Sequence, residues 1–334
     1  MSQRPILYYL GPEGTFTHQA ALQAQAGLET ALGRAPRLAA VDRASSIIER
    51  VDQGRGWGIL AWENNVEGTV VPNLDGLINA PRTAGFARLG LDITFDAFVR
   101  PDHGVLTQVS AHPHGLAQCR AFSDAMGLEE VPATSNAAAC RDLGPQQVGL
   151  GPALCGRLYG LDRYRAGVQD FQGARTDFLL LAPRGQAVEL SQAWARAQRG
   201  GNTASDTCAY ESILALIPLQ TGPGVLAGLL DRMRDAGLNM TAFMSRPIKG
   251  QDGAYSFIAT VDSAPWEPSL HTLLEDLAGR AVWVKTLAVD ARMPRPDPPV
   301  DQWMLPVGGL VAGRSSAGEP TAISKNEELL WPTM

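Results

Sequence analysis

An apolar run that stops abruptly at a carboxylate and two amides sets the fold class of this chain. The run from Ile59 to Trp62 is followed directly by Glu63, Asn64 and Asn65. A short apolar run of this kind is typical of a buried parallel strand. Because ligands of open α/β sheets bind beyond the carboxyl ends of such strands, these polar residues are predicted to lie at a functional edge. The same residues also suit a plain strand-to-helix loop, since Asn favours capping and turn positions.

Other predicted strands also end in polar loops. The run Ile6–Leu10 leads into a loop that contains Gly14 and Thr15, and Thr15 can cap the helix that follows. Ser135 and Asn136 cap another predicted helix after a short strand. Helix N-termini present free N–H groups to an anion. Strands and helices alternate in this way through residues 1–185, which predicts a two-lobed α/β domain with its site in the cleft between the lobes.

The second half of the chain follows a different pattern. Residues 186–206 read as a short helix and then a polar linker. Residues 207–292 show the order β-α-β-β-α-β, which is the ferredoxin-like arrangement. Residues 293–334 are rich in Pro, Gly and Ser, so we expect a disordered tail.

Composition excludes several classes of function. The net charge is −6, and the chain has no run rich in Lys and Arg, so nucleic acid and anionic membranes are poor partners. The four cysteines form no C-x-x-C pair, and they are expected to be buried thiols of a cytoplasmic protein. His112 and His114 flank a proline and share no helix face, so we expect neither a metal site nor a cofactor.

Eight short motifs follow one another in a characteristic order. They are Gly11–Phe16, Glu63–Gly68, His112–Pro113 with Gln118–Cys119, Ser135–Ala138, Leu158–Gly160, Thr176–Phe178, Gly237–Thr241 and Ser245–Pro247. Through these motifs the chain resembles the prephenate dehydratases, followed by the ACT domain that regulates them. The resemblance implies a two-lobed catalytic domain, like a periplasmic binding protein, and then a ferredoxin-like ACT domain.

The resemblance implies the conversion of prephenate to phenylpyruvate in phenylalanine biosynthesis. Aromatisation drives this reaction, so the protein must hold two carboxylates, align the departing groups and donate a proton or hydrogen bond to the ring hydroxyl. Thr176 matches the family's donor, and Glu63, Asn64 and Gln118 match other catalytic pocket residues. The substrate-binding residues expected on the same ground are Gly14, Thr15, Asn65, Ser135, Asn136 and Phe178.

For the C-terminal region, the resemblance implies that phenylalanine binds as an effector at a subunit interface. A homodimer or homotetramer is therefore expected. Met244 stands where the family has a glutamate, which weakens the expected site for an effector amine. The residues expected to contact the effector are Gly224, Leu226, Asn239, Thr241, Ser245, Arg246 and Pro247.

The chain departs from the family pattern around the predicted cleft. The family's Thr-Arg-Phe reads Thr176-Asp177-Phe178, and Asn65, His114 and Asn136 also replace other family residues. Asp177 can point away from the site by strand alternation, with Arg175 supplying a positive charge instead. Two alternatives remain open: a prephenate decarboxylase that keeps the ring hydroxyl, and a catalytically weak amino-acid sensor. The sequence also leaves prephenate and arogenate open as substrates.

Overall fold

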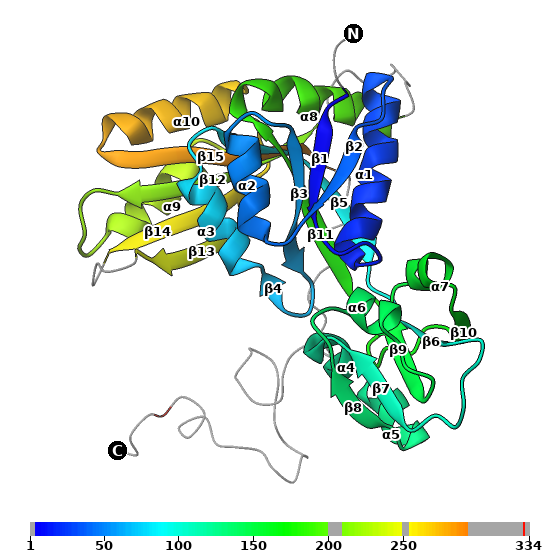
Figure 1. Ribbon diagram of the computed structural model, residues 1–334. Coiled ribbons are helices and arrows are strands. Elements are labelled where there is room, and N and C mark those ends of the chain that lie inside the picture. The colour runs from blue at the N-terminus through cyan, green and yellow to red at the C-terminus, as the bar shows by residue number, and fades with distance from the viewer. Residues whose placement is uncertain (1–3, 200–208, 249–253, 293–329, 331–334) are drawn as a thin grey trace. The chain divides into compact units, whose positions relative to one another are not determined.

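The computed structural model describes residues 4–199, 209–248, 254–292 and 330 (Figure 1). The chain divides into two units, residues 1–292 and 293–334. Only Leu330 of the second unit is described, so the predicted disordered tail lies outside the described residues, as does the polar end of the predicted linker. The helices and strands of the described residues all belong to the first unit.

The larger of two sheets has ten strands. They are β1 (Ile6–Leu10), β2 (Arg37–Val41), β3 (Trp57–Asn64), β4 (Gly68–Thr69), β5 (Thr83–Asp92), β11 (Arg175–Pro183), β12 (Tyr210–Pro218), β13 (Met240–Pro247), β14 (Tyr255–Val261) and β15 (Val282–Ala291). Their order is β13-β14-β12-β15-β5-β11-β3-β1-β2, and β4 pairs with β3 off this path.

The smaller sheet has five strands and forms a second lobe. They are β6 (Asp96–Val99), β7 (Gln108–Ala111), β8 (Glu129–Pro132), β9 (Gln147–Gly151) and β10 (Asp162–Arg165), in the order β10-β6-β9-β7-β8. The chain leaves the larger sheet after β5 and returns to it at β11. This double crossing confirms the predicted two-lobed α/β fold.

The alternating sequence of residues 89–100 predicts one long strand, and this prediction is wrong. The structure breaks it into β5, which ends at Asp92, and β6, which begins at Asp96. The residues between them bond to the returning segment: Ile93 N–H donates to the Ala174 carbonyl (2.7 Å), and Phe95 N–H donates to Oε1 of Gln169 (3.0 Å). The two crossings between the lobes are thus hydrogen-bonded to each other, which sequence alternation could not reveal.

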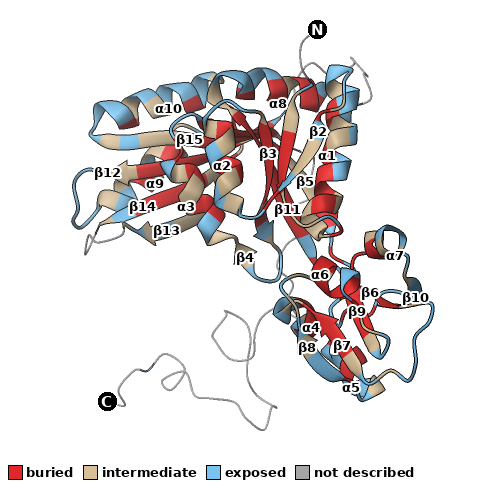
Figure 2. Cartoon of the chain, in the orientation of Figure 1, coloured by how far each residue is buried: buried red, intermediate tan, exposed pale blue. Residues whose placement is uncertain are grey.

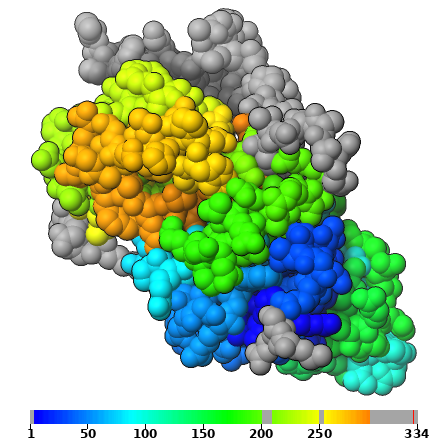
Figure 3. Space-filling view, turned by 90° about the horizontal axis from the view of Figure 1, so that it is seen from above, coloured from blue at the N-terminus to red at the C-terminus, as the bar shows by residue number. Residues whose placement is uncertain are grey.

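Ten helices pack on these sheets in the described part of the chain. They are α1 (Phe16–Leu32), α2 (Ala44–Asp52), α3 (Val71–Asn79), α4 (Pro113–Gln118), α5 (Arg120–Met126), α6 (Asn136–Arg141), α7 (Leu154–Tyr159), α8 (Arg184–Gln198), α9 (Val225–Asp235) and α10 (Pro268–Gly279). Figure 2 shows the central strands largely buried beneath them, and in Figure 3 α8 (green) is flanked by α10 (orange) and α1 (blue).

Strand β11 contributes to two separate cores. Phe178 and Leu180 pack in the core that includes α1 and α8, whereas Leu179 and Leu181 pack in the core that includes α2 and α3. Successive side chains of a strand point to opposite faces, so a continuous apolar run is needed in a strand covered on both sides. The same alternation decides where the polar residues at the start of β11 point.

Residues 210–291 have the ferredoxin-like topology that the sequence predicts. The elements β12, α9, β13, β14, α10 and β15 follow in that order, and all adjacent strand pairs among them are antiparallel. This part of the chain also joins the first lobe. Strand β15 pairs in parallel with β5, and Ile213 and Ala215 of β12 share a core with Leu179 and Leu181 of β11.

The expectation that the cysteines are buried thiols is met for those that the structure describes. Cys119, Cys140 and Cys155 are free and buried, as predicted, whereas Cys208 lies outside the described residues. None of the helices in the described ranges combines the length and the apolar composition that a membrane crossing requires.

Candidate active site

Asn64 and Thr176, two predicted catalytic residues 112 positions apart, are joined directly by a hydrogen bond. They face each other because β3 and β11 pair antiparallel with Asn64 opposite Thr176. Nδ2 of Asn64 donates to Oγ1 of Thr176 at 2.9 Å. Oδ1 of Asn64 accepts from the backbone N–H groups of Val66 (2.8 Å) and Glu67 (3.1 Å), which fixes the amide orientation. Asn64 is therefore held as a donor to Thr176.

This arrangement determines what the Thr176 hydroxyl can do. The Thr176 oxygen already accepts a hydrogen bond from Asn64, so its own proton is left to donate elsewhere. The residue is only 9% exposed, and a partly desolvated donor interacts more strongly than one in water. The pair is suited to donating a hydrogen bond to a leaving hydroxyl group.

Asn65 is held by the segment just before Thr176. Its backbone N–H donates to the Arg175 carbonyl (3.0 Å), its Oδ1 accepts from Arg175 N–H (2.8 Å), and its Nδ2 donates to the Gly173 carbonyl (2.9 Å). These bonds engage both ends of the amide. The geometry therefore gives Asn65 a supporting role for the start of β11 rather than a free group for a ligand.

The loop with Gly14 and Thr15 meets the second lobe. Sγ of Cys155 lies 3.3 Å from the Gly14 carbonyl, and the Tyr159 hydroxyl donates to the Glu13 carbonyl at 2.5 Å. Gly14 has φ = 85°, and a Cβ there would lie 2.8 Å from the Tyr159 hydroxyl oxygen, so glycine is required. The motif around Tyr159 signalled this contact, but the sequence analysis did not assign the residue to the site.

The polar groups of this loop are largely satisfied internally. Thr15 caps α1, since its Oγ1 accepts from His18 N–H (3.1 Å) and donates to the Pro12 carbonyl (3.0 Å). Gly14 N–H donates to Nδ1 of His18 (3.0 Å). Burial lowers the pKa of His18, which keeps the ring neutral and able to accept that bond. The loop is thus rigid, and it places the positive end of the α1 dipole at the first lobe's edge.

Ser135, Asn136 and His112 form a second polar group, in the smaller lobe. Oγ of Ser135 accepts from Ala138 N–H (3.0 Å), which leaves the hydroxyl proton to donate. Oδ1 of Asn136 accepts from His112 N–H (2.9 Å), so this residue ties α6 to the start of α4. Burial and the neighbouring His114 lower the pKa of His112, so its neutral ring accepts from His114 N–H (3.3 Å).

Gln118 has its side chain available. It is half-buried at the end of α4, and the described residues provide no hydrogen-bond partner for its amide. Its carbonyl accepts from Asp170 N–H at 2.7 Å, which ties α4 to the segment that returns to β11. Across the lobes, Nδ1 of His114 lies 3.9 Å from a carboxylate oxygen of Glu67, in the turn after Asn64. The predicted residues of the two lobes are thus linked around one region.

Comparison with known proteins identifies the family. The profile described as "Prephenate dehydratase" matches residues 7–186. A prephenate dehydratase of Mycobacterium sp. (strain JLS) is 32% identical over 310 residues, covering 88% of this chain and 93% of that protein. The chain belongs to the prephenate dehydratase family. The prephenate dehydratase of Arthrobacter aurescens, solved in complex with L-Phe, superposes with a TM-score of 0.70 at 25% identity and covers 88% of this chain and 93% of that one.

A further structural neighbour has a different description. A protein described as a novel type of quorum quenching acylase superposes with a TM-score of 0.70 at 22% identity, covering 86% of this chain and 98% of that one. Identity this low establishes a shared fold and nothing further. The family assignment of this prephenate dehydratase homologue therefore depends on the profile match and on the relatives at 32% identity.

The most conspicuous departure from the family motif points away from the Asn64–Thr176 pair. Asp177 precedes Phe178 in β11, so strand alternation directs its side chain to the face opposite that of Thr176. On that face Oδ1 of Asp177 accepts from Nε of Arg175 at 3.1 Å. The two residues, two positions apart, share a face and pair with each other. Arg175 therefore does not supply a positive charge on the Thr176 face.

Phe178 was expected to contact substrate, and the structure places it differently. Its side chain is 2% exposed and lies in the core beneath α1 and α8. An aromatic ring of this size stabilises that core. It affects the site only indirectly, because it fixes the position of Thr176 two residues earlier in β11. We therefore leave Phe178 out of the substrate contacts of this family member.

The predicted effector residues lie on two elements: Gly224 and Leu226 are at the start of α9, and the others are on or next to β13. Strand β13 is the terminal strand of the larger sheet. Arg246 differs from the others, because its Nη2 lies 3.3 Å from both carboxylate oxygens of Asp75 on α3. The predicted effector residues that are exposed are Gly224, Leu226, Asn239, Thr241, Ser245 and Pro247.

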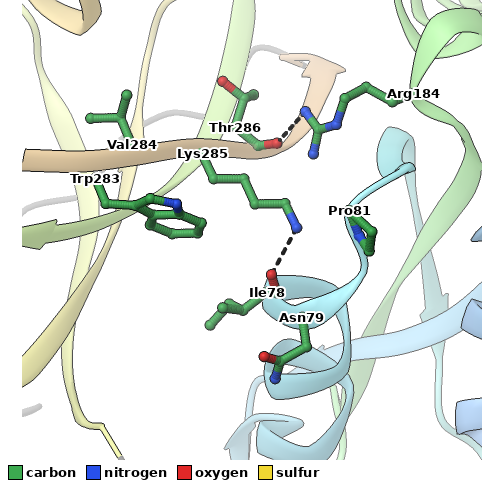
Figure 4. A pocket seen from close by; sticks show the side chains of 8 residues that line it. All are labelled: Ile78, Asn79, Pro81, Arg184, Trp283, Val284, Lys285 and Thr286. Atoms are coloured by element: carbon green, nitrogen blue, oxygen red, sulfur yellow. Dashed lines mark hydrogen bonds between the residues drawn. The ribbon is translucent and has the colours of Figure 1, made fainter. Parts of the chain in front are cut away.

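A cavity of about 560 Å³ lies away from this site, between α3 and β15 (Figure 4). Nζ of Lys285 donates to the carbonyls of Leu77 (3.1 Å), Ile78 (2.7 Å) and Ala80 (2.6 Å), which caps the end of α3. Arg184 donates to the Thr286 carbonyl at 2.9 Å. No cluster of three or more metal-ligating side chains occurs among the described residues.

Proposed function

We propose that this chain converts prephenate to phenylpyruvate, and that Thr176 is the hydrogen-bond donor to the departing ring hydroxyl. In this reaction the bond between the ring and its carboxylate breaks and carbon dioxide leaves. The released electron pair enters the ring as the carbon–oxygen bond breaks, and the hydroxyl leaves with a proton as water. Because the ring becomes aromatic, the enzyme must supply position and one donor more than strong acid or base chemistry.

The hydrogen bond from Asn64 to Thr176 is the observation that best supports this proposal. A threonine hydroxyl is a weak acid, so it acts as a donor that stabilises developing negative charge on the leaving oxygen. The hydrogen bond from Asn64 occupies one lone pair of the Thr176 hydroxyl oxygen, and it therefore limits the directions in which the Thr176 hydroxyl proton can point. Glu63 precedes Asn64 at the end of β3 and is exposed.

Substrate binding is proposed for groups that retain free donors. Gln118 has an unengaged amide, and the Ser135 hydroxyl retains its proton. The α1 N-terminus near Gly14 and Thr15 places a positive dipole end toward a carboxylate. Asn65 and Asn136 are proposed to hold these loops in place, because their amides are engaged with the backbone.

The domain boundaries, the effector and the oligomeric state are also proposed from the resemblance to the family. We propose a catalytic domain at residues 1–185, a linker at 186–206 and an ACT domain at 207–292 that binds an amino acid such as phenylalanine. The related Arthrobacter aurescens enzyme was solved with L-Phe, which supports that effector class. Asn239, Thr241, Ser245 and Pro247 are exposed on or next to the edge strand β13, which supports a site completed by a second subunit, in a homodimer or homotetramer. A cytoplasmic location is proposed from the sequence alone.

The test is the mass of the product formed from prephenate, compared with a reaction without enzyme. Loss of carbon dioxide and water together, with phenylpyruvate as product, supports the proposal. Loss of carbon dioxide alone would identify a decarboxylase and overturn it. If prephenate gives no product, arogenate is tested next. Phenylalanine binding without turnover of either compound would identify a sensor.

A further inference from the structure

Two carboxylates oppose each other next to the catalytic pair. Glu63 of β3 lies opposite Asp177 of β11, one register position from Asn64 and Thr176. Like charges placed directly across a strand pair are destabilising. The end of β3 must stay aligned with β11 for Asn64 to reach Thr176, so a positive charge near the two carboxylates favours this register.

Arg88 of β5 is placed to offset it. Asp177 lies opposite Gly90 on β5, and Arg88 is two residues from Gly90 on the same face. Arg88 is therefore a diagonal neighbour of Asp177, within reach of a long side chain. Its side chain is only 15% exposed. Nη2 of Arg88 lies 3.3 Å from Oε2 of Glu211 and 3.6 Å from Oδ1 of Asp290.

The carboxylates around Arg88 also act on its pKa. Burial lowers the pKa of the Arg88 guanidinium, but Asp290, Glu211, Asp177 and Glu63 outweigh that effect, and the pKa is raised. Nε of Arg88 is buried and has no hydrogen-bond partner among the described residues. The guanidinium is thus retained in this position mainly by the surrounding negative charge.

Arg175 provides a second, more exposed cation. Its side chain is 47% exposed, and it pairs with Asp177 at 3.1 Å. The guanidinium lies over Gly90, where an added Cβ would come within 1.8 Å of Nη2, so only glycine leaves room for it. Solvent screens an exposed pair of this kind. Arg88 is thus the less exposed of the two arginines on the face of Asp177.

The same cation reaches the ferredoxin-like region. Glu211, which pairs with Arg88, also accepts a hydrogen bond from the Thr241 hydroxyl at 2.6 Å. Thr241 is one of the proposed effector residues. Arg88 therefore lies between the candidate regulatory edge and the strand ends that hold Asn64 and Thr176.

We propose that Arg88 is a positioning residue of the proposed dehydratase site. Its buried positive charge offsets the repulsion between Glu63 and Asp177 and so keeps the end of β3 aligned with β11, which joins Asn64 to Thr176. The inference rests on the proposed function, because the Asn64–Thr176 pair matters only if Thr176 acts on substrate. It assigns a reason for tolerating Asp177 in this chain: a nearby buried arginine compensates for it.

The test compares Arg88→Met and Arg88→Lys with two double variants. Arg88→Met should lower kcat by roughly 10- to 100-fold with a much smaller change in KM, since slight misplacement affects the reacting geometry more than binding. Arg88→Lys should preserve most of the activity.

The double variants separate a specific role from general charge balance. Arg88→Met/Asp177→Asn removes the opposed pair, and Arg88→Met/Asp290→Asn removes a carboxylate that lies 3.6 Å from Arg88 and does not oppose Glu63. The proposal expects the first to recover kcat at least several-fold over Arg88→Met, and the second to recover less. Equal recovery in both would overturn it. So would a wild-type kcat in folded Arg88→Met.

A readout independent of turnover completes the design. Hydrogen exchange at Asn65 N–H, which donates to the Arg175 carbonyl, should be faster in Arg88→Met than in wild type and Arg88→Lys. Unchanged exchange would contradict the positioning role. If Arg88→Met does not fold, the two double variants are compared with each other by the same measurements. Wild-type protein without phenylpyruvate formation would instead refute the proposed function, so the two failures are distinguishable.

Discussion

Thr176 and Asp177 are adjacent in β11, yet they face opposite sides of the larger sheet. Thr176 accepts a hydrogen bond from Asn64, and Asp177 accepts one from Arg175. The replacement of an arginine by an aspartate in the family's Thr-Arg-Phe motif therefore changes the charge on the face opposite the Asn64–Thr176 pair, not on the face of the proposed donor. This relationship removes the main reason for expecting a changed reaction in this chain.

Removing the Thr176 hydroxyl should abolish most turnover. Thr176→Val keeps the branched shape and loses the donor, so we expect kcat to fall by about 10²- to 10³-fold with KM nearly unchanged. Thr176→Ser restores a hydroxyl and should retain a large part of the rate. Steady-state phenylpyruvate formation measures both. Similar activity in the valine and serine variants would remove Thr176 from the donor role.

Asn64→Asp should be as damaging as loss of the hydroxyl. The aspartate still accepts from Val66 and Glu67 N–H groups, so the turn persists, but its second oxygen would accept the Thr176 proton. The donor is then directed away from substrate. We expect kcat to fall by about 10²-fold and the double variant Asn64→Asp/Thr176→Val to be no worse than Thr176→Val. Additive losses in that cycle would show that the residues act separately.

Gln118 should affect substrate binding without affecting stability. Its amide has no partner in the described chain, so Gln118→Ala removes a contact only when substrate is present. One lost hydrogen bond predicts a KM higher by about 2- to 12-fold. Gln118→Glu keeps the shape but adds negative charge near a dianion, and its KM should rise further. A change in melting temperature without a change in KM would contradict this assignment.

Asp75 should influence effector coupling. It pairs with Arg246, and α3 is tied to β3 by the Asn73 side chain, which donates to the Ala61 carbonyl at 2.7 Å. An effector carboxylate would compete with Asp75 for Arg246. Asp75→Asn should therefore bind phenylalanine more tightly by calorimetry, while saturating phenylalanine changes turnover less. Asp231→Asn, an exposed control on α9, should leave both measurements as in wild type. The idea fails if Asp75→Asn matches that control.

Lys285 should produce a distinctive dependence of stability on pH. Burial, and then the nearby Arg184, lower the pKa of Lys285 to about 8. Between that value and the ordinary lysine pKa, the unfolded chain binds more protons at this group than the folded protein does. The contribution of Lys285 to the free energy of unfolding therefore rises with pH across this window. Denaturant unfolding measures the free energy of unfolding of wild type and of Lys285→Met. The value for wild type minus the value for Lys285→Met should increase from pH 8 to pH 10. If this signed value stays constant or decreases with pH, the lowered pKa of Lys285 is contradicted.

Local patterns predicted most of the secondary structure. The run Ile59–Trp62 and the polar residues after it gave the end of β3, and the β-α-β-β-α-β order of residues 210–291 is as predicted. Apolar residues at every second position identify strands, and apolar residues at helical spacing identify helices. These patterns arise because a strand or helix buries one face against the core, or both faces in the case of a central strand. The break between β5 and β6 was missed because it depends on hydrogen bonds to residues far along the chain, such as Ala174.

The sequence by itself determined the family, the two-lobed α/β fold with its ferredoxin-like region, and the residue types available at the site. Only the tertiary structure decided which of those residues act together. The pairing of β3 with β11 joins Asn64 to Thr176, and the same register sets Glu63 against Asp177 near Arg88. Strand register and side-chain face arise from contacts between segments more than a hundred residues apart, so no local pattern could specify them.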